Sequence, residues 1–120
     1  MENFSDQKVS NLDYLTELSK GNKKFIADMV GIFLEENPGE IALLEESIRN
    51  KNFDSIKAYA HKLKSSIPFV GINKIIDKDI AEMEDLAVKR TDLEKIQLLF
   101  DTVKIVCEKA RMELHEFQAT

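Results

Sequence analysis

A histidine surrounded by lysines and a small serine is the part of this sequence best suited to chemistry. His61 lies in a segment whose apolar residues recur at helical steps of three and four, namely Ile56, Tyr59, Ala60, Leu63 and Ile67. At 100° per residue, His61 points about 160° away from Leu63, roughly opposite the apolar stripe. The periodicity therefore predicts a histidine on the solvent-exposed face of a helix.

The side chains that share this face indicate what the histidine could do. Lys57, Lys64 and Ser65 lie on its side of the helix at helical spacing. Nearby cations disfavour the imidazolium, so the two lysines are expected to keep His61 neutral near pH 7. A neutral ring nitrogen is a nucleophile, and ammonium groups can pair with an incoming phosphoryl group. The small Ser65 would let a partner approach. The alternative is a surface histidine without function on a solvated lysine face.

Composition limits the class of protein. The chain of 120 residues fits one domain, and 43% hydrophobic with 32% charged residues is ordinary for a globular protein. A net charge of −5 argues against nucleic-acid binding, which usually requires a basic face. Residues 55–76 nevertheless contain no Asp or Glu and four lysines, so the histidine helix forms a local positive strip.

The lack of a recognisable targeting or membrane-spanning segment and the low cysteine content favour a cytoplasmic protein with no membrane association. No apolar run approaches the ~20 residues needed to span a bilayer. The first residues, Met1–Asp6, lack the basic start and apolar core of a signal peptide. The single cysteine, Cys107, cannot form an internal disulfide, which fits a reducing compartment. The starting methionine and the lack of a trailing linker favour a free-standing protein over an excised domain.

Helical patterns cover most of the chain. We expect a short helix over 10–19, with Leu12, Leu15 and Leu18 as its apolar side, and a strongly apolar helix face from Phe25 to Leu34. Residues 37–40, Asn-Pro-Gly-Glu, have the sequence of a helix start, with an N-cap asparagine and proline at the first helical position. A new helix is therefore expected there, continuing to residue 50.

The second half of the chain gives three further helices. The histidine helix should begin near Asp54 and end or kink at Pro68, which lacks the N–H that would bond the carbonyl of residue 64. A further stripe consists of Ile76, Ile80, Met83 and Ala87. Residues 91–94 resemble a capping box that opens the last helix, whose seam is Leu93, Ile96, Phe100, Val103, Cys107, Ala110, Leu114 and Phe117.

These elements predict an all-α fold. Long amphipathic helices with short connections favour an antiparallel four-helix bundle with an additional short N-terminal helix. We expect residues 1–120 to form a single helical-bundle domain with its core at about 10–117.

The run from His61 to Gly71 resembles the motif of the histidine-phosphotransfer (HPt) domain family, H-x-L-K-G-[SA]-[SA]-x-x-x-G. The length of the chain and the mid-helix position of the histidine are also similar to that family. The resemblance implies that His61 is the phospho-acceptor, that Lys64 supports the phosphoryl group and that Gly71 helps close the turn. Ser65 stands where the family most often has glycine, at the point where a receiver domain approaches.

The resemblance also implies a role and partners. It predicts a non-enzymatic phosphocarrier of a two-component phosphorelay, which takes a phosphoryl group from the phospho-aspartate of one receiver domain and passes it to another. The receivers of hybrid histidine kinases and response regulators would be its partners and would supply the magnesium, so the chain itself would need no cofactor. A monomer is expected. The absence of a glycine-rich phosphate loop agrees with a carrier that has no kinase site.

Two other classes of protein are alternatives. A histidine-kinase dimerisation domain usually places an acid directly after the histidine, where this chain has Lys62, and no ATP-binding domain follows. A helical interaction module without phosphotransfer would keep the fold and would not need the lysine-flanked histidine. Substituting His61→Gln distinguishes such a module from a relay protein.

Other noticeable residues receive a structural interpretation. Cys107 is expected to be a small buried hydrophobe, and Met29 and Met83 to fill the core. His115 is expected on the surface, and two histidines with one cysteine give little support for a metal site. The glutamate pairs 35–36 and 45–46 are interpreted as solvated helix surface. Phe69 could either cap the core or join a receiver-docking patch beside the histidine.

Overall fold

The computed structural model describes residues 7–119, and within them it contains helices and no strand. The α-helices are α1 (Asp13–Ser19), α2 (Lys23–Arg49), α3 (Phe53–Ser66), α4 (Asn73–Val88) and α5 (Leu93–Ala119), and a 3-10 turn, η1 (Ile67–Val70), follows α3. The predicted all-α class is confirmed. The expectation about a signal peptide concerns Met1–Asp6, which lie outside the described residues.

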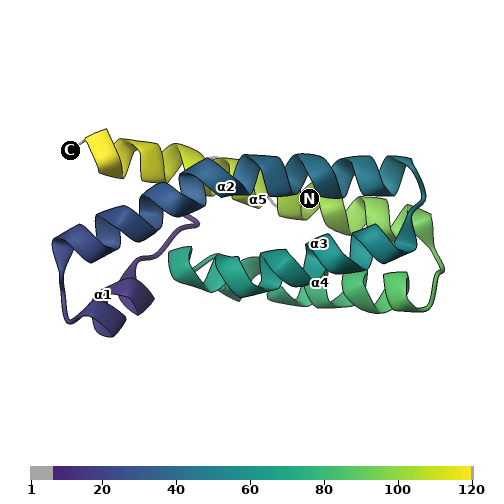
Figure 1. The fold of residues 1–120 in the computed structure, drawn as a ribbon, viewed down its shortest axis with the longest axis horizontal. Coiled ribbons are helices and arrows are strands. Elements are labelled where there is room, and N and C mark those ends of the chain that lie inside the picture. Colours follow the sequence, from purple (N-terminus) through teal and green to yellow (C-terminus); the bar gives the residue numbers. More distant parts are fainter. Residues whose placement is uncertain (1–6, 120) are drawn as a thin grey trace.

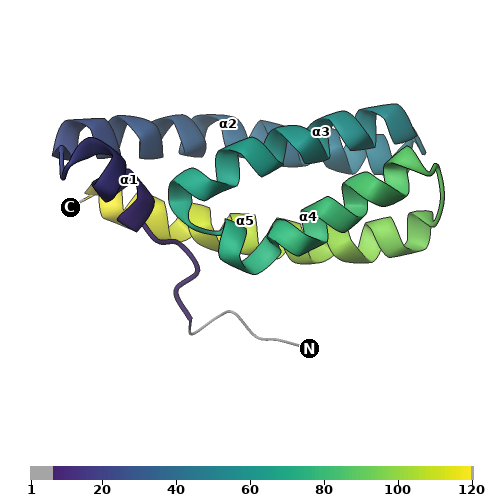
Figure 2. The same ribbon diagram turned by 90° about the horizontal axis from the view of Figure 1, so that it is seen from below.

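The four long helices lie side by side and run in alternating directions along the chain (Figures 1 and 2). Contacts join α2 to α3, α3 to α4, α4 to α5, and α5 back to α2. The short α1 lies at the end of the molecule where α3 turns into α4, and it contacts η1 and α2 (Figure 1). The histidine helix α3 therefore has α2 on one side and α4 on the other.

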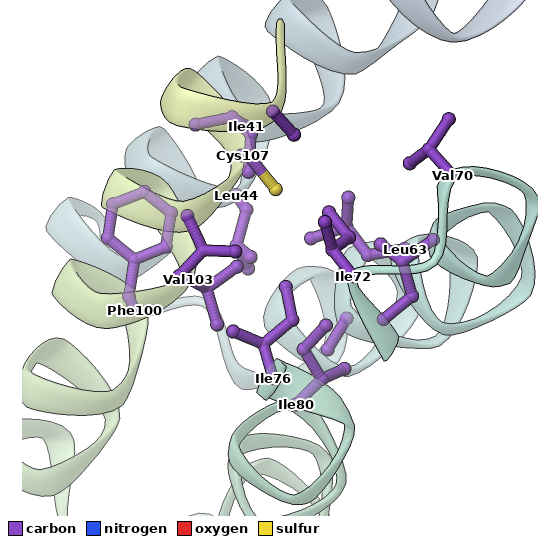
Figure 3. Close-up of a cluster of buried hydrophobic side chains, with 14 of the residues drawn as sticks. Ile41, Leu44, Leu63, Val70, Ile72, Ile76, Ile80, Phe100, Val103 and Cys107 are labelled. Carbon is purple, nitrogen blue, oxygen red and sulfur yellow. The ribbon is translucent and has the colours of Figure 1, made fainter. Parts of the chain in front are cut away.

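The apolar stripes of these helices meet in one core. Leu44 of α2, Leu63 of α3, Ile76 of α4 and Phe100 of α5 belong to one buried cluster to which the four helices contribute (Figure 3). In α3, the fully buried residues are three members of the predicted stripe, Ile56, Ala60 and Leu63. Burial of that stripe fixes the rotation of α3 about its axis and so turns the opposite face toward solvent.

The predicted helix start at residues 37–40 is wrong, because α2 continues through Pro38 without a break. A proline inside a helix removes one backbone hydrogen bond and costs about 3 kcal/mol. Tertiary contacts hold the preceding residue in place: Asn37 is 1% exposed, its side-chain amide nitrogen lies 3.7 Å from the Cys107 sulfur, and its side-chain oxygen accepts a hydrogen bond from Arg111. The asparagine therefore joins α2 to α5 and is not an N-cap.

Two other helix starts differ from the expected ones. The helix α1 begins at Asp13, since the Ser10 N–H donates to Glu113 and the Asn11 N–H donates to the Val70 carbonyl oxygen at 2.8 Å. Leu18, expected on its apolar side, is exposed. At α5 the cap is Asp92, whose carboxylate accepts the Lys95 N–H at 3.1 Å, and no capping box forms from residue 91.

The end of the histidine helix agrees with the sequence. The helix α3 ends at Ser66, two residues before Pro68, and the chain continues as the 3-10 turn η1 before reversing at Gly71. Among residues 7–119, no helix is long and apolar enough to cross a membrane.

Candidate functional site

His61 lies on the exposed face of α3, as the periodicity predicted, and its side chain is 73% exposed. The buried residues Ala60 and Leu63 on either side of it hold the helix in this orientation. Lys57, one helical turn earlier, lines the same shallow depression as His61, together with Ala58 and Asp54 of α3 and Glu84 of α4. The imidazole is therefore open to a large partner.

A carboxylate from the next helix contacts the histidine, which the local sequence pattern did not indicate. An oxygen of Glu84 lies 3.1 Å from Nδ1 of His61, and its other oxygen lies 3.8 Å from the Lys64 ammonium nitrogen. The Glu84 side chain is 19% exposed, so α4 holds it partly buried beneath the histidine. The lysines that the sequence places around His61 are thus joined at the ring by a carboxylate from α4.

Ser65 is exposed at the position where the motif most often has glycine. Its hydroxyl donates a hydrogen bond to the Lys62 carbonyl oxygen at 2.7 Å, within the same helix. The hydroxyl thus already has an acceptor and does not depend on a partner for one. Relative to glycine, Ser65 adds one hydroxymethyl group to the surface beside His61.

Lys62, the residue after the histidine, turns toward α2. Its ammonium nitrogen lies 3.7 Å from a carboxylate oxygen of Glu40, whose side chain is 8% exposed. Burial raises the pKa of the Glu40 carboxyl, and Lys62 opposes that shift. This pair separates Lys62 from the group formed by His61, Lys64 and Glu84.

A small cleft of about 160 Å³ lies on the α2 side of the site. Ser65, Ser66 and Phe69 form one wall, and α2 supplies Met29, Ile32, Phe33, Glu36, Asn37 and Glu40. Phe69 is half-buried, and its ring lies 5.9 Å from that of Tyr14 of α1. Phe69 therefore both packs against the core and lines a partly apolar surface beside the histidine helix.

Gly71 is required for close packing against the N-terminal segment. Its φ is +77°, a left-handed conformation that favours glycine. A Cβ at this position would lie 2.6 Å from both the Cβ and the carbonyl oxygen of Asn11. Gly71 thus closes the turn after η1, but the segment it packs most closely against precedes α1, and Gly71 does not contribute to the group around His61.

The positions of the cysteine, the two methionines and His115 agree with their structural interpretations. Cys107 is buried in α5, and burial raises the pKa of its thiol to about 11, which disfavours the reactive thiolate. Met83 is fully buried and Met29 partly so, while His115 is exposed. Within residues 7–119, no group of three or more His, Cys, Asp and Glu side chains is arranged to hold a metal ion.

Glu84 and Glu40 are the site residues that sequence reasoning missed. A signal for Glu84 existed: His61 lies 11 residues before Ile72 and Glu84 lies 12 residues after it, so antiparallel helices joined near that residue bring them level. Glu84 also follows the core residue Met83, at the edge of the buried stripe of α4. Glu40 was missed because the sequence predicts a helix start at Asn37. That prediction places Glu40 in the first turn of a new helix and not on the buried face of α2.

Comparison with known protein families matches residues 28–112 to the Hpt domain. The match covers well over half of the chain and includes α3, η1, α4 and the parts of α2 and α5 that face them. Comparisons with curated proteins and with solved structures give no match. Hpt domains are phosphocarriers of histidine phosphorelays that interact with receiver domains and are not enzymes in their own right. This chain, with its exposed histidine between two lysines, belongs to the Hpt domain family.

Proposed function

We propose that His61 accepts a phosphoryl group from the phospho-aspartate of one receiver domain and passes it to the aspartate of another. The observation that carries this proposal is the exposure of His61 within the Hpt-matched region, beside Lys57 and Lys64. A ring nitrogen that is open to a partner can attack phosphorus in line, and the lysines can balance the charge of the phosphoryl oxygens.

Lys64 is the residue proposed to support the phosphoryl group. Its side chain is 43% exposed, and Lys64 lies one turn after His61 on the same face. Its 3.8 Å contact with Glu84 is long for an ion pair, so the lysine can turn to a phosphoryl group on the histidine at little cost. Lys57, which lines the same depression, adds a second cation one turn before His61.

The receiver domain is proposed to dock over His61 and the cleft beside it. Ile32 is 48% exposed and shares the cleft with Phe69, which provides apolar area next to the reacting group. Ser65 would lie under the partner, and its internally bonded hydroxyl would lose no hydrogen bond on docking. In this proposal, an Hpt domain with glycine at that position would differ from this chain mainly in how closely the docked receiver approaches the helix.

The remaining features of the proposal concern the whole chain. The four long helices serve as an antiparallel bundle forming a single domain, which acts as a monomer in the cytoplasm. The receiver supplies the magnesium and the acidic pocket, and the chain contributes neither a cofactor nor a kinase site. Hybrid kinases and response regulators are the proposed sources of these receivers.

The test is transfer from phosphorylated receivers. The protein is mixed with each phosphorylated receiver domain of its source organism, and acid-labile, alkali-stable phosphate on the chain is measured. The proposal expects rapid labelling by at least one receiver and none in His61→Gln. If the folded protein binds a receiver but takes no label from any of them, it is a helical interaction module and the proposal is wrong.

A further inference from the structure

The outward face of α5 carries three exposed apolar residues at a spacing of seven. Leu98, Ile105 and Met112 are 66%, 49% and 65% exposed, and Leu98 and Met112 are the two most exposed large hydrophobic residues among residues 7–119. At 100° per residue, Ile105 points about 180° away from the buried Ile96, and the other two lie within about 20° of Ile105. The three side chains therefore form one stripe, about 21 Å long, on the solvent side of α5.

A row of acids accompanies this stripe. Each of the three apolar residues follows an exposed acid by four residues, one helical turn; these acids are Glu94, Asp101 and Glu108. Asp101 accepts a hydrogen bond from the neutral amide of Gln97 at 2.8 Å, and among residues 7–119 no ion pair holds any of the three acids. The lysines of α5 do not compensate them because their ammonium groups lie against other acids: Lys95 against Glu82, Lys104 against Glu45 and Lys109 against Glu113.

This face lies on the other side of the bundle from the histidine. Contacts join α5 to α2 and to α4, and the same two helices separate it from α3. His61 points outward from α3, whereas Ile105 points outward from α5. A partner on the α5 face would therefore leave the histidine open to a receiver.

We propose that the outward face of α5 docks a basic amphipathic helix of another protein, which holds the phosphocarrier near that protein without covering His61. Apolar side chains at heptad spacing on the partner would pack against Leu98, Ile105 and Met112, as in a left-handed pair of helices. Lysines or arginines beside that seam would lie against the three acids, and this complementarity would select the partner.

The charge of the face argues against other occupants. Nucleic acid and anionic lipid headgroups are repelled by a row of uncompensated carboxylates on a chain with a net charge of −5. A second copy of the chain would bring two acidic faces together. A basic helix is the occupant that satisfies both the apolar stripe and the acids beside it.

The test uses the full chain and two synthetic peptides of three heptads each. Both have leucine at the first and fourth positions of the heptad and alanine elsewhere, except that the fifth and seventh positions are lysine in one peptide and glutamate in the other. Binding is measured by isothermal titration calorimetry at low and high salt, and amide NMR resonances of the protein locate the site. The lysine peptide should bind, shift resonances of residues 94–116 in α5, and bind more weakly as salt rises. The glutamate peptide should not bind.

One pair of variants tests the apolar stripe. Ile105→Ala keeps a good helix former and removes most of an exposed aliphatic side chain, so it should weaken binding of the lysine peptide by about tenfold. Val88→Ala makes a similar change at an exposed valine of α4 and should have no effect.

A second pair tests the acids. Asp101→Asn combined with Glu108→Gln should weaken binding of the lysine peptide by about threefold to tenfold and reduce its salt dependence. Glu35→Gln combined with Glu46→Gln makes the same change of net charge at two exposed acids of α2 and should leave binding nearly unchanged.

The inference is overturned if the lysine peptide does not bind, if folded Ile105→Ala binds it as the unsubstituted protein does, or if the resonances of His61 shift on binding. Sedimentation that reveals a dimer which Ile105→Ala dissociates would also overturn it, because a second copy would then cover the face. Circular dichroism establishes that each variant is folded. The outcome does not depend on the proposed function, since no receiver or phosphoryl donor takes part.

Discussion

The contact between Gly71 and Asn11 gives a prediction about stability that three glycines test together. In Gly71→Ala the new Cβ would lie 2.6 Å from Asn11, in a residue with a φ of +77°. The left-handed conformation costs a non-glycine residue about 1 kcal/mol or slightly more. Moving Asn11 away also weakens its backbone hydrogen bond to Val70, which is worth about 1 kcal/mol.

The sum is about 2–3 kcal/mol, or a fall in Tm of about 10 °C for a domain of this size. Two other glycines separate the contributions. Gly21 has a φ of +79°, and a Cβ added there would meet no atom within 4 Å, so Gly21→Ala should cost only the conformational part, about 1 kcal/mol. Gly39 lies inside α2 with equally open surroundings, so Gly39→Ala should stabilise the protein by about 0.5–1 kcal/mol.

Urea unfolding followed by circular dichroism measures all three variants. The expected order of stability is Gly39→Ala, the unsubstituted protein, Gly21→Ala and then Gly71→Ala. If Gly71→Ala is no less stable than Gly21→Ala, the close approach of the N-terminal segment to the turn after η1 is refuted. The conformational reasoning itself fails if Gly21→Ala is as stable as the unsubstituted protein.

Two further predictions concern charge. Lys64→Ala should slow transfer from a phosphorylated receiver by about threefold to tenfold and weaken the salt dependence of the rate. Lys74 is an exposed lysine of α4, and Lys74→Ala, which makes the same change of charge, should have little effect. Equal rates in both variants would remove the role given to Lys64. Burial raises the pKa of Glu40, so the folded state keeps this proton to higher pH than the unfolded chain, and the resulting stabilisation is lost as pH rises from the ordinary value of 4.5 through the raised value. The free energy of unfolding should therefore fall relative to Glu40→Gln as the pH is raised from about 4 to 7, and a constant difference across this range would contradict the assignment.

The exposed half of the site could be predicted from the sequence because it depends on one helix. The stripe of Ile56, Ala60 and Leu63 determines which way α3 faces, so the exposure of His61 and Lys64 follows from helical periodicity alone. The end of the helix before Pro68 likewise depends on a local property, the missing N–H of proline.

Features that depend on a second helix were not predictable in the same way. Glu84 reaches His61 only once α3 and α4 are paired in register, which the pattern within α3 does not show. Asn37 has the sequence context of an N-cap, but Arg111 and Cys107 of α5 bind its side chain inside a continuous helix. In both places, contacts with another helix determine the role of the side chain, and local sequence preference does not.

The central claim is tested most directly by following one phosphoryl group through His61. A receiver carrying a radiolabelled phosphoryl group is mixed with the protein, the labelled protein is purified, and a second receiver is added. We predict that the label appears on His61, that it moves to the second receiver, and that His115→Gln behaves as the unsubstituted protein while His61→Gln takes no label. Label that persists in folded His61→Gln, or that never leaves His61 for any receiver, would contradict the proposed relay.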